Sequence, residues 1–327
     1  MGKTNILVTG GAGYIGSITT ELLLEEGYDV IVIDDLRDGK REAVLESARF
    51  YFGDYGNEIS ISKLIIQYNI NTVIHFAASA KIPESVKEPE LFYFNNFVNG
   101  LALLRVMLGE GCKNIIFSSS AAVYGEPDYV PIDEGHPKRP INPYGQTKLD
   151  FERILYWYHK AYGLRANCFR YFNAAGATER LGEWRKEESH LIPLTIETAL
   201  GKREKLKIYG NDYDTKDGTC IRDYVHVRDI ARAHVLALKN LEERPYEAYN
   251  LGSEKGYSVL EVVEKVSEVT GIEVNHEVVG RRAGDAVRLV ASNGKAKAEL
   301  GWEPELGLEE MIRSTWEWKE KGEWKWK

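Results

Sequence analysis

The chain has 327 residues, with 42 basic and 50 acidic side chains for a formal net charge of −8, and 43% of its residues are hydrophobic. This length suits one large α/β domain with a smaller companion. The acidic balance argues against a protein that holds nucleic acid through phosphate contacts, so we expect no nucleic-acid partner.

The cysteine pattern and the N-terminus indicate a cellular compartment. Cys112, Cys168 and Cys220 lie far apart with no CxxC spacing, which is typical of a reducing cytosol and offers no disulfide framework or thiolate metal site. The first expected strand begins at residue 5, which leaves no room for a signal peptide. No apolar run approaches the length that spans a bilayer. We therefore expect a cytoplasmic protein with no membrane partner.

The N-terminal half alternates short β-rich runs with helical stretches. Between the first two runs, Ile15, Ile18 and Leu22 recur at helical spacing, and Gly27 follows as a C-cap. Such alternation predicts an α/β fold with a doubly wound, parallel, Rossmann-type sheet, whose ligands bind beyond the carboxyl ends of the strands. The runs that we expect to form buried strands are residues 5–9, 30–33, 49–52, 72–76, 114–118 and 166–170.

A glycine run follows directly on the first strand. Gly10, Gly13 and Gly16 let the backbone approach a pyrophosphate, and the helix that opens there offers free N–H groups and a partial positive charge. The second strand ends in the pair Asp34-Asp35, and a carboxylate at that place binds ribose hydroxyls and repels a 2′-phosphate. The pattern predicts NAD rather than NADP, a preference that the nearby Arg37 would soften.

Two more strand ends suit adenine and ribose contacts. Asp54-Tyr55 ends the third strand and Phe76-Ala77-Ala78 ends the fourth, where small residues let a cofactor lie close to the backbone. Taken alone, each is better explained by ordinary packing. We expect the neighbouring His75 to be a satisfied core histidine, and because no histidine has metal-ligand spacing we expect no metal.

The strongest chemical signal is the segment around Tyr144. Pro143 suits the first turn of a helix with Asn142 as its N-cap, so that Tyr144 and Lys148 fall one turn apart on the same face. A tyrosine hydroxyl titrates at about 10, and an adjacent ammonium together with a positive nicotinamide ring would lower its pKa toward the working range. We therefore expect Tyr144 to be an acid/base, with Lys148 also reaching the nicotinamide ribose.

A serine hydroxyl completes this catalytic group. Ser118, Ser119 and Ser120 end the fifth strand, close to the expected nicotinamide, and a hydroxyl there bridges the substrate oxygen and the tyrosine. We favour Ser120, although the sequence does not separate it cleanly from Ser119. The combination predicts an enzyme that moves a hydride and a proton at one carbinol carbon.

Beyond about residue 173 the character of the chain changes. Residues 179–189 and 210–218 are polar loops, residues 225–241 suggest a strand end and a helix, and residues 259–270 suggest another helix. We expect residues 1–173, with a return segment at about 221–250, to bind the dinucleotide, and residues 174–327 mainly to bind the substrate. The tail, with Trp316, Trp318, Trp324 and Trp326 among charges of mixed sign, favours a packed or frayed terminal helix over a membrane anchor.

Together these motifs resemble the extended short-chain dehydrogenase/reductase family over nearly the whole chain. The segment at 212–224 is the most specific, and it is similar to the family's UDP-hexose epimerases. The segments that carry the resemblance are TGGAGYIG, HFAA at 75–78, ESV at 84–86, SSSAAVYGE, YGQTK, RYFNAAGA at 170–177, YGNDYDTKDGTCIRDYVHV at 209–227, YNLG at 249–252 and RRAGD at 281–285.

The resemblance implies an isomerase that interconverts UDP-galactose and UDP-glucose at C4 with a permanently bound NAD. It implies a homodimer built from helices near 95–108 and 143–161. Further cofactor contacts are implied at Tyr14, Ile15, Asn96, Ser118 and Phe172. Substrate contacts are implied at Ser120, Tyr144, Asn173, His190, Leu191, Lys207, Ile208, Tyr209, Arg222, Arg282, Asp285 and Leu289.

Chemistry supports the arginines in this set, because a planar guanidinium grips diphosphate oxygens in bidentate fashion. For Arg222 the alternative is a surface salt bridge to Asp223 or Asp229. Three positions depart from the family pattern. Asn is common where this chain has His190. One extra residue precedes Asn96, which makes Asn95 an alternative.

The third departure concerns substrate size. The residue that limits sugar bulk, a tyrosine in some members, is Leu289 here, which is compatible with N-acetylated UDP-hexoses. Rival functions are a nucleotide-sugar dehydratase or decarboxylase, a uronate- or pentose-specific epimerase, and a non-catalytic NAD sensor. Dehydratases need an acidic pair where this chain has Ala121 and Ala122, and a sensor has no need of the Tyr144–Lys148 pair.

Overall fold

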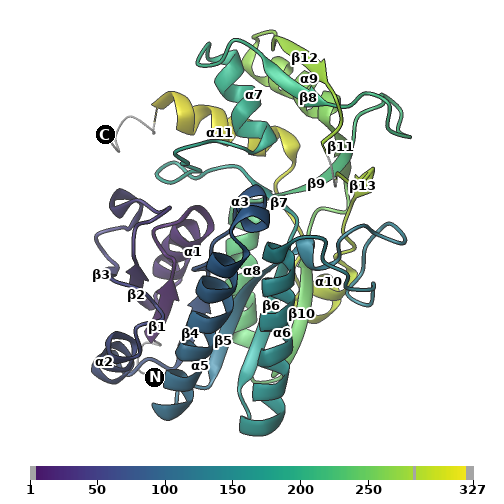
Figure 1. Ribbon diagram of the computed structural model, residues 1–327. Coiled ribbons are helices and arrows are strands. Elements are labelled where there is room, and N and C mark those ends of the chain that lie inside the picture. The colour runs from purple at the N-terminus through teal and green to yellow at the C-terminus, as the bar shows by residue number, and fades with distance from the viewer. Residues whose placement is uncertain (1–4, 283–284, 322–327) are drawn as a thin grey trace.

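A seven-stranded parallel sheet forms the centre of the molecule, in the order β10-β6-β5-β4-β1-β2-β3 (Figure 1). The computed structural model describes residues 5–282 and 285–321. The predicted doubly wound, Rossmann-type sheet is confirmed. Its strands are β1 Asn5–Thr9, β2 Asp29–Asp34, β3 Arg49–Phe52, β4 Thr72–His75, β5 Asn114–Ser120, β6 Arg165–Tyr171 and β10 Tyr246–Leu251.

Two features of this sheet differ from the sequence prediction. Strand β10 was not predicted as a strand, and it adds a seventh member beside β6. Strand β3 was predicted to be buried, but Arg49 and Phe52 are exposed because β3 is the sheet edge and pairs only with β2. The aromatic composition of residues 49–52 therefore predicted the strand correctly, but not its position at the edge of the sheet.

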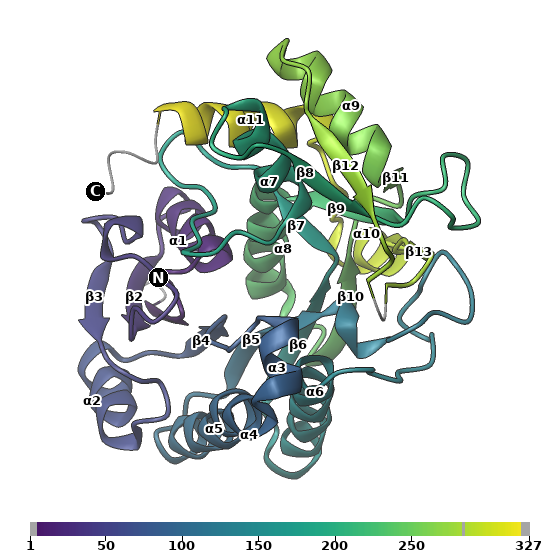
Figure 2. The same cartoon turned by 45° about the horizontal axis from the view of Figure 1, so that its top comes forward.

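Helices cover both faces of the sheet, as Figure 2 shows. Side chains alternate along β1, so that Ile6 and Val8 join one core cluster and Leu7 joins the other. The first cluster lies under α1 (Tyr14–Glu25), α8 (Val227–Asn240) and α10 (Gly294–Leu300). The second lies under α2 (Glu58–Tyr68), α5 (Asn99–Gly109) and α6 (Pro143–Tyr162).

The sequence predicts no apolar run long enough to span a bilayer, but the structure contains a helical run that passes this test. By length and composition alone, Pro89–Gly109 could cross a bilayer, with 39% of its apolar window buried. It consists of α4 (Pro89–Tyr93), a π turn η2 (Phe94–Val98) and α5, preceded by α3 (Ile82–Lys87). Phe92, Leu103 and Met107 are fully buried, and the run packs against α6 and α2. These contacts place one side of the run in the core, while Leu91, Phe94 and Val98 are exposed on it.

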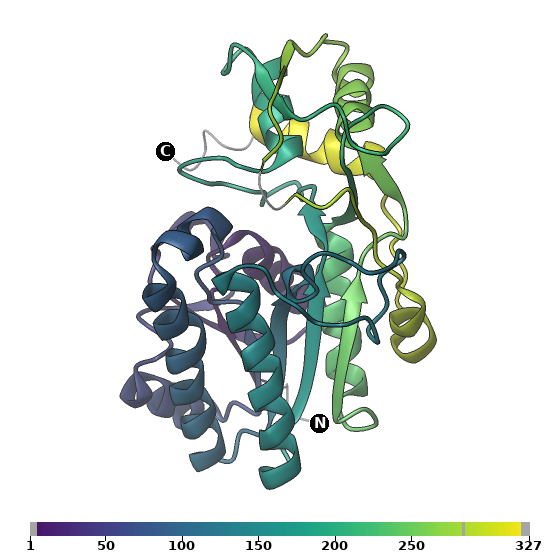
Figure 3. The same ribbon diagram turned by 45° about the vertical axis from the view of Figure 1, so that its right-hand side comes forward.

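The remaining elements gather beyond the carboxyl ends of the large sheet (Figure 3). Strand β9 (Ile221–His226) pairs with β7 (Asn173–Ala175), β11 (Gly256–Ser258) and β13 (Arg288–Leu289). Strand β8 (Leu206–Tyr209) pairs with β12 (His276–Val279). Helices α7 (Leu191–Ala199), α9 (Val259–Thr270) and α11 (Leu308–Lys321) share a third core cluster. After β9 the chain returns to the large sheet through α8 and β10. Two short 3-10 turns, η1 (Arg41–Ala43) and η3 (Ala121–Val123), also form in the described part of the chain.

Several local predictions for this half are confirmed. The helix expected at 259–270 is α9, and the strand end and helix expected at 225–241 are β9 and α8. Trp318 of α11 is buried, and its ring lies so close to Gly182 that a Cβ there would be 2.3 Å away. The packed terminal helix is thus confirmed for Trp318, whereas Trp324 and Trp326 lie outside the described residues.

Candidate active site

The glycine turn joins β1 to α1 with the geometry of an anion site. Gly10 has φ of +73°, and a Cβ on it would lie 2.6 Å from the main-chain nitrogen of Ala77. Only glycine therefore fits where the ends of β1 and β4 meet. Gly13 is the N-cap of α1 and makes no side-chain capping bond. The N–H groups of the first turn are thus free to bind a pyrophosphate, which Tyr14, Ile15 and Gly16 would flank.

The end of β2 provides a carboxylate beside this turn. Asp34 accepts hydrogen bonds from the main-chain nitrogens of Ala12 (2.9 Å) and Leu36 (2.8 Å), and burial raises its pKa. Arg37, predicted to soften a preference for NAD, forms an ion pair of 2.9 Å with Asp35. The ion pair with Asp35 neutralises Arg37. Arg37 is therefore less suited to binding the 2′-phosphate that distinguishes NADP from NAD.

The next two strand ends place aromatic side chains in the core. The hydroxyl of Tyr55 donates to the main-chain oxygen of Asn95, and its ring packs edge-on against His75 with centroids 4.9 Å apart. The ring of Phe76 packs against His234 at the same distance. Ordinary packing in the core therefore accounts for the side chains of Tyr55 and Phe76. A ligand at these two strand ends would contact main-chain atoms. Asp54 accepts from Gly56 N at 2.7 Å.

His75 is a satisfied core histidine, as predicted. Its Nδ1 lies 2.7 Å from the Thr9 hydroxyl, and burial lowers its pKa to about 3. The neutral imidazole therefore supports the floor of the site rather than acting in it. Ala77 and Ala78 follow β4 at this place, and Ala77 N donates to Thr9 O.

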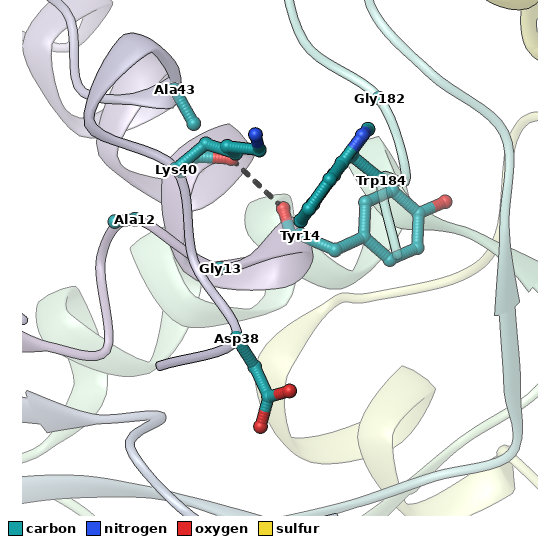
Figure 4. Close-up of a pocket in the computed structure, with 9 residues that line it drawn as sticks. Ala12, Gly13, Tyr14, Asp38, Lys40, Ala43, Gly182 and Trp184 are labelled. Atoms are coloured by element: carbon teal, nitrogen blue, oxygen red, sulfur yellow. Dashed lines mark hydrogen bonds between the residues drawn. The ribbon is translucent and has the colours of Figure 1, made fainter. Parts of the chain in front are cut away.

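A small pocket lies over the glycine turn (Figure 4). Gly13, Tyr14, Asp38 and Lys40 line one side of it, and Gly182 and Trp184 from the loop after β7 line the other. Lys40 Nζ lies 3.8 Å from the centre of the Trp184 ring. Sequence reasoning missed Trp184, because it stands in a segment predicted only as a polar loop. The one available signal was a large aromatic side chain among charges.

Helix α6 presents the predicted tyrosine and lysine. The side chain of Asn142 accepts from Gly145 N at 2.8 Å and Pro143 follows it, so the predicted cap is confirmed. Lys148 is buried and its Nζ donates to Ser118 O at 2.7 Å. The same Nζ lies 5.8 Å from the centre of the Tyr144 ring, so the two side chains share one face.

The pKa of Tyr144 differs from expectation. Burial raises the pKa of this phenol, whereas a hydrogen bond with Ser120 and the charge of Arg185 lower it. Lys148 lies over the ring of Tyr144, and burial lowers the pKa of the lysine itself to about 7. Arg185 was missed because it stands 41 positions beyond the tyrosine in sequence, in the loop that also carries Trp184.

The structure separates the two candidate serines. Ser120 lies close enough to Tyr144 to lower the pKa of its phenol, and it accepts from Ala122 N at 3.1 Å. Ser119 is buried and donates instead to Glu152 at 2.5 Å. Only Ser120 is therefore placed beside the phenol.

Asn95 and Asn96, the two candidates for the cofactor contact, both lie in the π turn η2, Phe94–Val98. Both asparagines are buried and reach Ser79. Asn95 donates to its hydroxyl at 3.0 Å, and Asn96 donates to its main-chain oxygen at 3.0 Å. Asn96 also donates to Thr147 at 3.1 Å, next to Lys148 in the chain. A π turn often occurs at functional sites.

Several predicted substrate residues lie on or next to β8, β9 and β13, in the group of elements beyond the carboxyl ends of the large sheet (Figure 3). Arg222 forms an ion pair of 3.3 Å with Asp285, and the guanidinium of Arg282 lies 4.2 Å from the centre of the Tyr209 ring. The alternative salt bridges of Arg222 to Asp223 or Asp229 are wrong. Asp223 accepts from the main-chain nitrogens of Ser253, Glu254 and Ala291, and Asp229 pairs with Arg232.

The other predicted substrate residues divide between core and solvent. Ile208 is buried, whereas Lys207 and Tyr209 are exposed on alternate positions of β8. Asn173 donates to Asp223 O at 2.7 Å. Leu289 packs against the cluster that contains Phe172. The residue predicted to limit sugar size therefore lies beside the cluster to which Phe172 belongs.

His190 belongs to a charged cluster at the start of α7, next to Leu191. Its Nδ1 lies 2.8 Å from Glu183, which also pairs with Arg185 at 2.7 Å. These partners lower the pKa of the buried Glu183 to about 2, and Glu183 raises the pKa of His190. Glu183, Glu188 and His190 are close enough to hold a metal ion, but Arg185 already neutralises Glu183. The cluster is thus an ion-pair network.

Comparison with known proteins gives consistent matches. Residues 6–252 match the NAD dependent epimerase/dehydratase family. The chain is 49% identical to the UDP-glucose 4-epimerase of Halalkalibacterium halodurans over 96% of this chain and 95% of that protein. The structure is similar to that of UDP-glucose 4-epimerase from Brucella ovis in complex with NAD, with a TM-score of 0.93, 44% identity and coverage of 96% and 97%. The enzyme from Bifidobacterium longum in complex with NAD+ and UDP gives a TM-score of 0.93 at 40% identity, with coverage of 97% and 98%.

Proposed function

The chain belongs to the NAD dependent epimerase/dehydratase family, and on this premise we propose that it is a UDP-glucose 4-epimerase, an isomerase that interconverts UDP-galactose and UDP-glucose. One observation carries the proposal. A phenol whose pKa the neighbouring Ser120 lowers lies on the same helix face as the buried Lys148, at the carboxyl edge of a sheet whose glycine turn suits a dinucleotide.

NAD fits the cofactor site that the residues make. We propose that the first turn of α1 at Gly13 and Tyr14 holds the pyrophosphate and that Asp34 binds the adenosine ribose. Main-chain atoms at Asp54, Tyr55 and Phe76 to Ala78 would line the adenine side. Asn96, Ser118, Lys148 and Phe172 would line the nicotinamide side. The bound NAD+ supplies a hydride acceptor and donor for the sugar carbon.

Tyr144 performs the proton chemistry in this proposal. As phenolate it takes the proton from the sugar 4-hydroxyl, while Ser120 hydrogen-bonds the same oxygen. The 4-keto sugar then turns over on its UDP tether and presents its opposite face, and Tyr144 returns the proton. Lys148 keeps a positive charge beside the phenol. No acidic pair stands at Ala121 and Ala122, so elimination of water has no acid or base at that place.

UDP must be held firmly while the sugar moves, because remote binding energy retains the intermediate. We propose that Arg222 and Arg282 bind the diphosphate, since guanidinium groups suit phosphate oxygens. Asp285 holds Arg222 in place. Asn173, His190, Leu191, Lys207, Ile208, Tyr209 and Leu289 would surround the rest of the UDP-sugar.

We further propose a homodimer. Leu91, Phe94 and Val98 are exposed on the α4–α5 run, and Trp157 is 63% exposed on the neighbouring α6. A two-fold contact between copies would bury this face. The domain division proposed is 1–173 with a return segment at about 221–250 for NAD, and 174–327 mainly for UDP-sugar. Three free, buried cysteines suit a cytoplasmic location.

The activity can be tested directly. The purified protein would be incubated separately with UDP-galactose, UDP-N-acetylgalactosamine and UDP-glucuronate, without added NAD+, and the products identified. UDP-glucose formed from UDP-galactose supports the proposal. Protein that carries NAD but converts no UDP-sugar would favour a sensor instead.

A further inference from the structure

A buried ion pair lies directly behind the catalytic helix. Glu152 of α6 and Arg170 of β6 are both nearly fully buried. Arg170 holds the carboxylate with two bonds, from Nε at 2.9 Å and from Nη2 at 2.6 Å. A fork of this kind fixes the position of a carboxylate as well as its charge.

The pair connects to both parts of the catalytic group. Glu152 follows Lys148 by one helical turn, so both point to the same side of α6. Ser119, next to Ser120 at the end of β5, donates to Glu152 at 2.5 Å. On its far side, Arg170 donates to the hydroxyl of Tyr124 at 2.8 Å, which donates in turn to Asn250 at 2.7 Å.

Glu152 is the neighbouring group whose negative charge favours the charged form of Lys148. Burial lowers the pKa of Lys148, and within the part of the chain that the structure describes, Glu152 is the group whose charge raises it. The neighbouring groups from the other elements supply no negative charge. His75 of β4 is neutral because its pKa is lowered to about 3. Desolvation raises the pKa values of the hydroxyls of the half-buried Tyr144 and the buried Tyr171.

From this arrangement we propose that Glu152 is a positioning residue of the active site, which holds Ser119 in place and keeps the ammonium of Lys148 charged beside Tyr144. Arg170 fixes the carboxylate for this role. The inference rests on the proposed function, since it assigns Lys148 a catalytic charge. A purely structural role would instead confine Glu152 to pairing with Arg170.

The test is Glu152→Gln, which keeps the shape and removes the charge. Loss of that charge lowers the pKa of Lys148, so the ammonium is lost at lower pH. We expect the alkaline limb of the kcat profile to move down by about one pH unit, so that kcat at about pH 9 falls roughly tenfold. Glu152→Asp, which keeps the charge, should restore the wild-type limb. Asp150→Asn removes a partly exposed carboxylate from the same helix and should leave the profile unchanged.

A second readout needs no substrate. The titration of the Lys148 ammonium, followed by NMR of the lysine nitrogen as wild type minus Lys148→Met, should occur at lower pH in Glu152→Gln, because the ammonium has lost its negatively charged neighbour. This measurement stays valid even if the protein does not act on UDP-galactose. An unmoved limb and an unmoved titration of Lys148 would reject the proposal, as would equal shifts in Glu152→Gln and Glu152→Asp.

If Glu152→Gln does not fold, the double variant Glu152→Gln, Arg170→Gln removes both buried charges together. Replacement of a whole buried pair is often tolerated where removal of one partner is not. The charge of Arg170 is not among the causes that shift the pKa of Lys148. The double variant should therefore show the same downward shift, and an unmoved alkaline limb in it would overturn the inference.

Discussion

The ammonium of Lys148 donates a 2.7 Å hydrogen bond to the main-chain oxygen of Ser118, which ties helix α6 to the end of strand β5. The bond is buried, and burial lowers the pKa of Lys148 to about 7. This one contact brings the helix that carries the phenol to the strand that carries Ser120. It also places a desolvated cation under the ring of Tyr144.

Burial of that cation makes a prediction about stability. The pKa of Lys148 in the folded protein is about 7, below its ordinary value of 10.5. Between these values the unfolded chain binds more protons, so this group makes the free energy of unfolding rise with pH and costs most at and below pH 7. Lys148→Met, freed of any dinucleotide, should be more stable than wild type at about pH 7.

The advantage of Lys148→Met should shrink as the pH rises toward about 10, because the cost of neutralising the wild-type lysine on folding falls as the pH nears its ordinary pKa of 10.5. Urea unfolding of the two proteins across this range measures the difference, and other titrating groups cancel between them. A difference that does not change with pH would mean that Lys148 is not desolvated as described.

Removal of the phenol oxygen tests the proton step. Tyr144→Phe should lower kcat by about three orders of magnitude, since general acid/base catalysis contributes on that scale. UDP binding, measured by calorimetry, should survive, because the diphosphate is assigned to arginines elsewhere. Tyr162→Phe, an exposed tyrosine on the same helix, is the control and should behave as wild type. Turnover near the wild-type rate in Tyr144→Phe would reject its role.

The glycine turn can be tested with two glycines that share a conformation. Gly10 and Gly27 have φ of +73° and +85°, but a Cβ would meet Ala77 only at Gly10, since nothing lies within 4 Å at Gly27. Gly27→Ala should cost about 1 kcal/mol for its backbone alone. Gly10→Ala should cost several kcal/mol and should lose dinucleotide on desalting. Equal losses in the two variants would contradict the close approach of β1 and β4.

Local signals in the sequence predicted much of this site. Gly10, the Asn142 cap and the one-turn spacing of Tyr144 and Lys148 depend on neighbours within a few residues, and the structure has them as predicted. A satisfied His75 followed from its place in an apolar strand. Such features depend on backbone conformation and periodicity, which a single segment carries.

Features that depend on distant partners could not be predicted. Arg222 pairs with Asp285, 63 positions away, because β9 lies beside β13, and no local pattern encodes that register. Strand β10 was missed because its first half is only partly buried and contains Glu247, which weakens the apolar pattern. Arg185 reaches Tyr144 only through the course of a long loop.

Leu289 gives the final prediction, which concerns the breadth of sugars. Its side chain packs against the cluster of Phe172 and Tyr124, beside the proposed sugar site. A tyrosine there would fill the space that an N-acetyl group needs. Leu289→Tyr should therefore lower kcat/KM for UDP-N-acetylgalactosamine, relative to that for UDP-galactose, by about tenfold or more. Leu289→Met conserves volume and should leave the ratio unchanged. If the ratio in Leu289→Tyr equals that of wild type, another residue limits the size of the sugar.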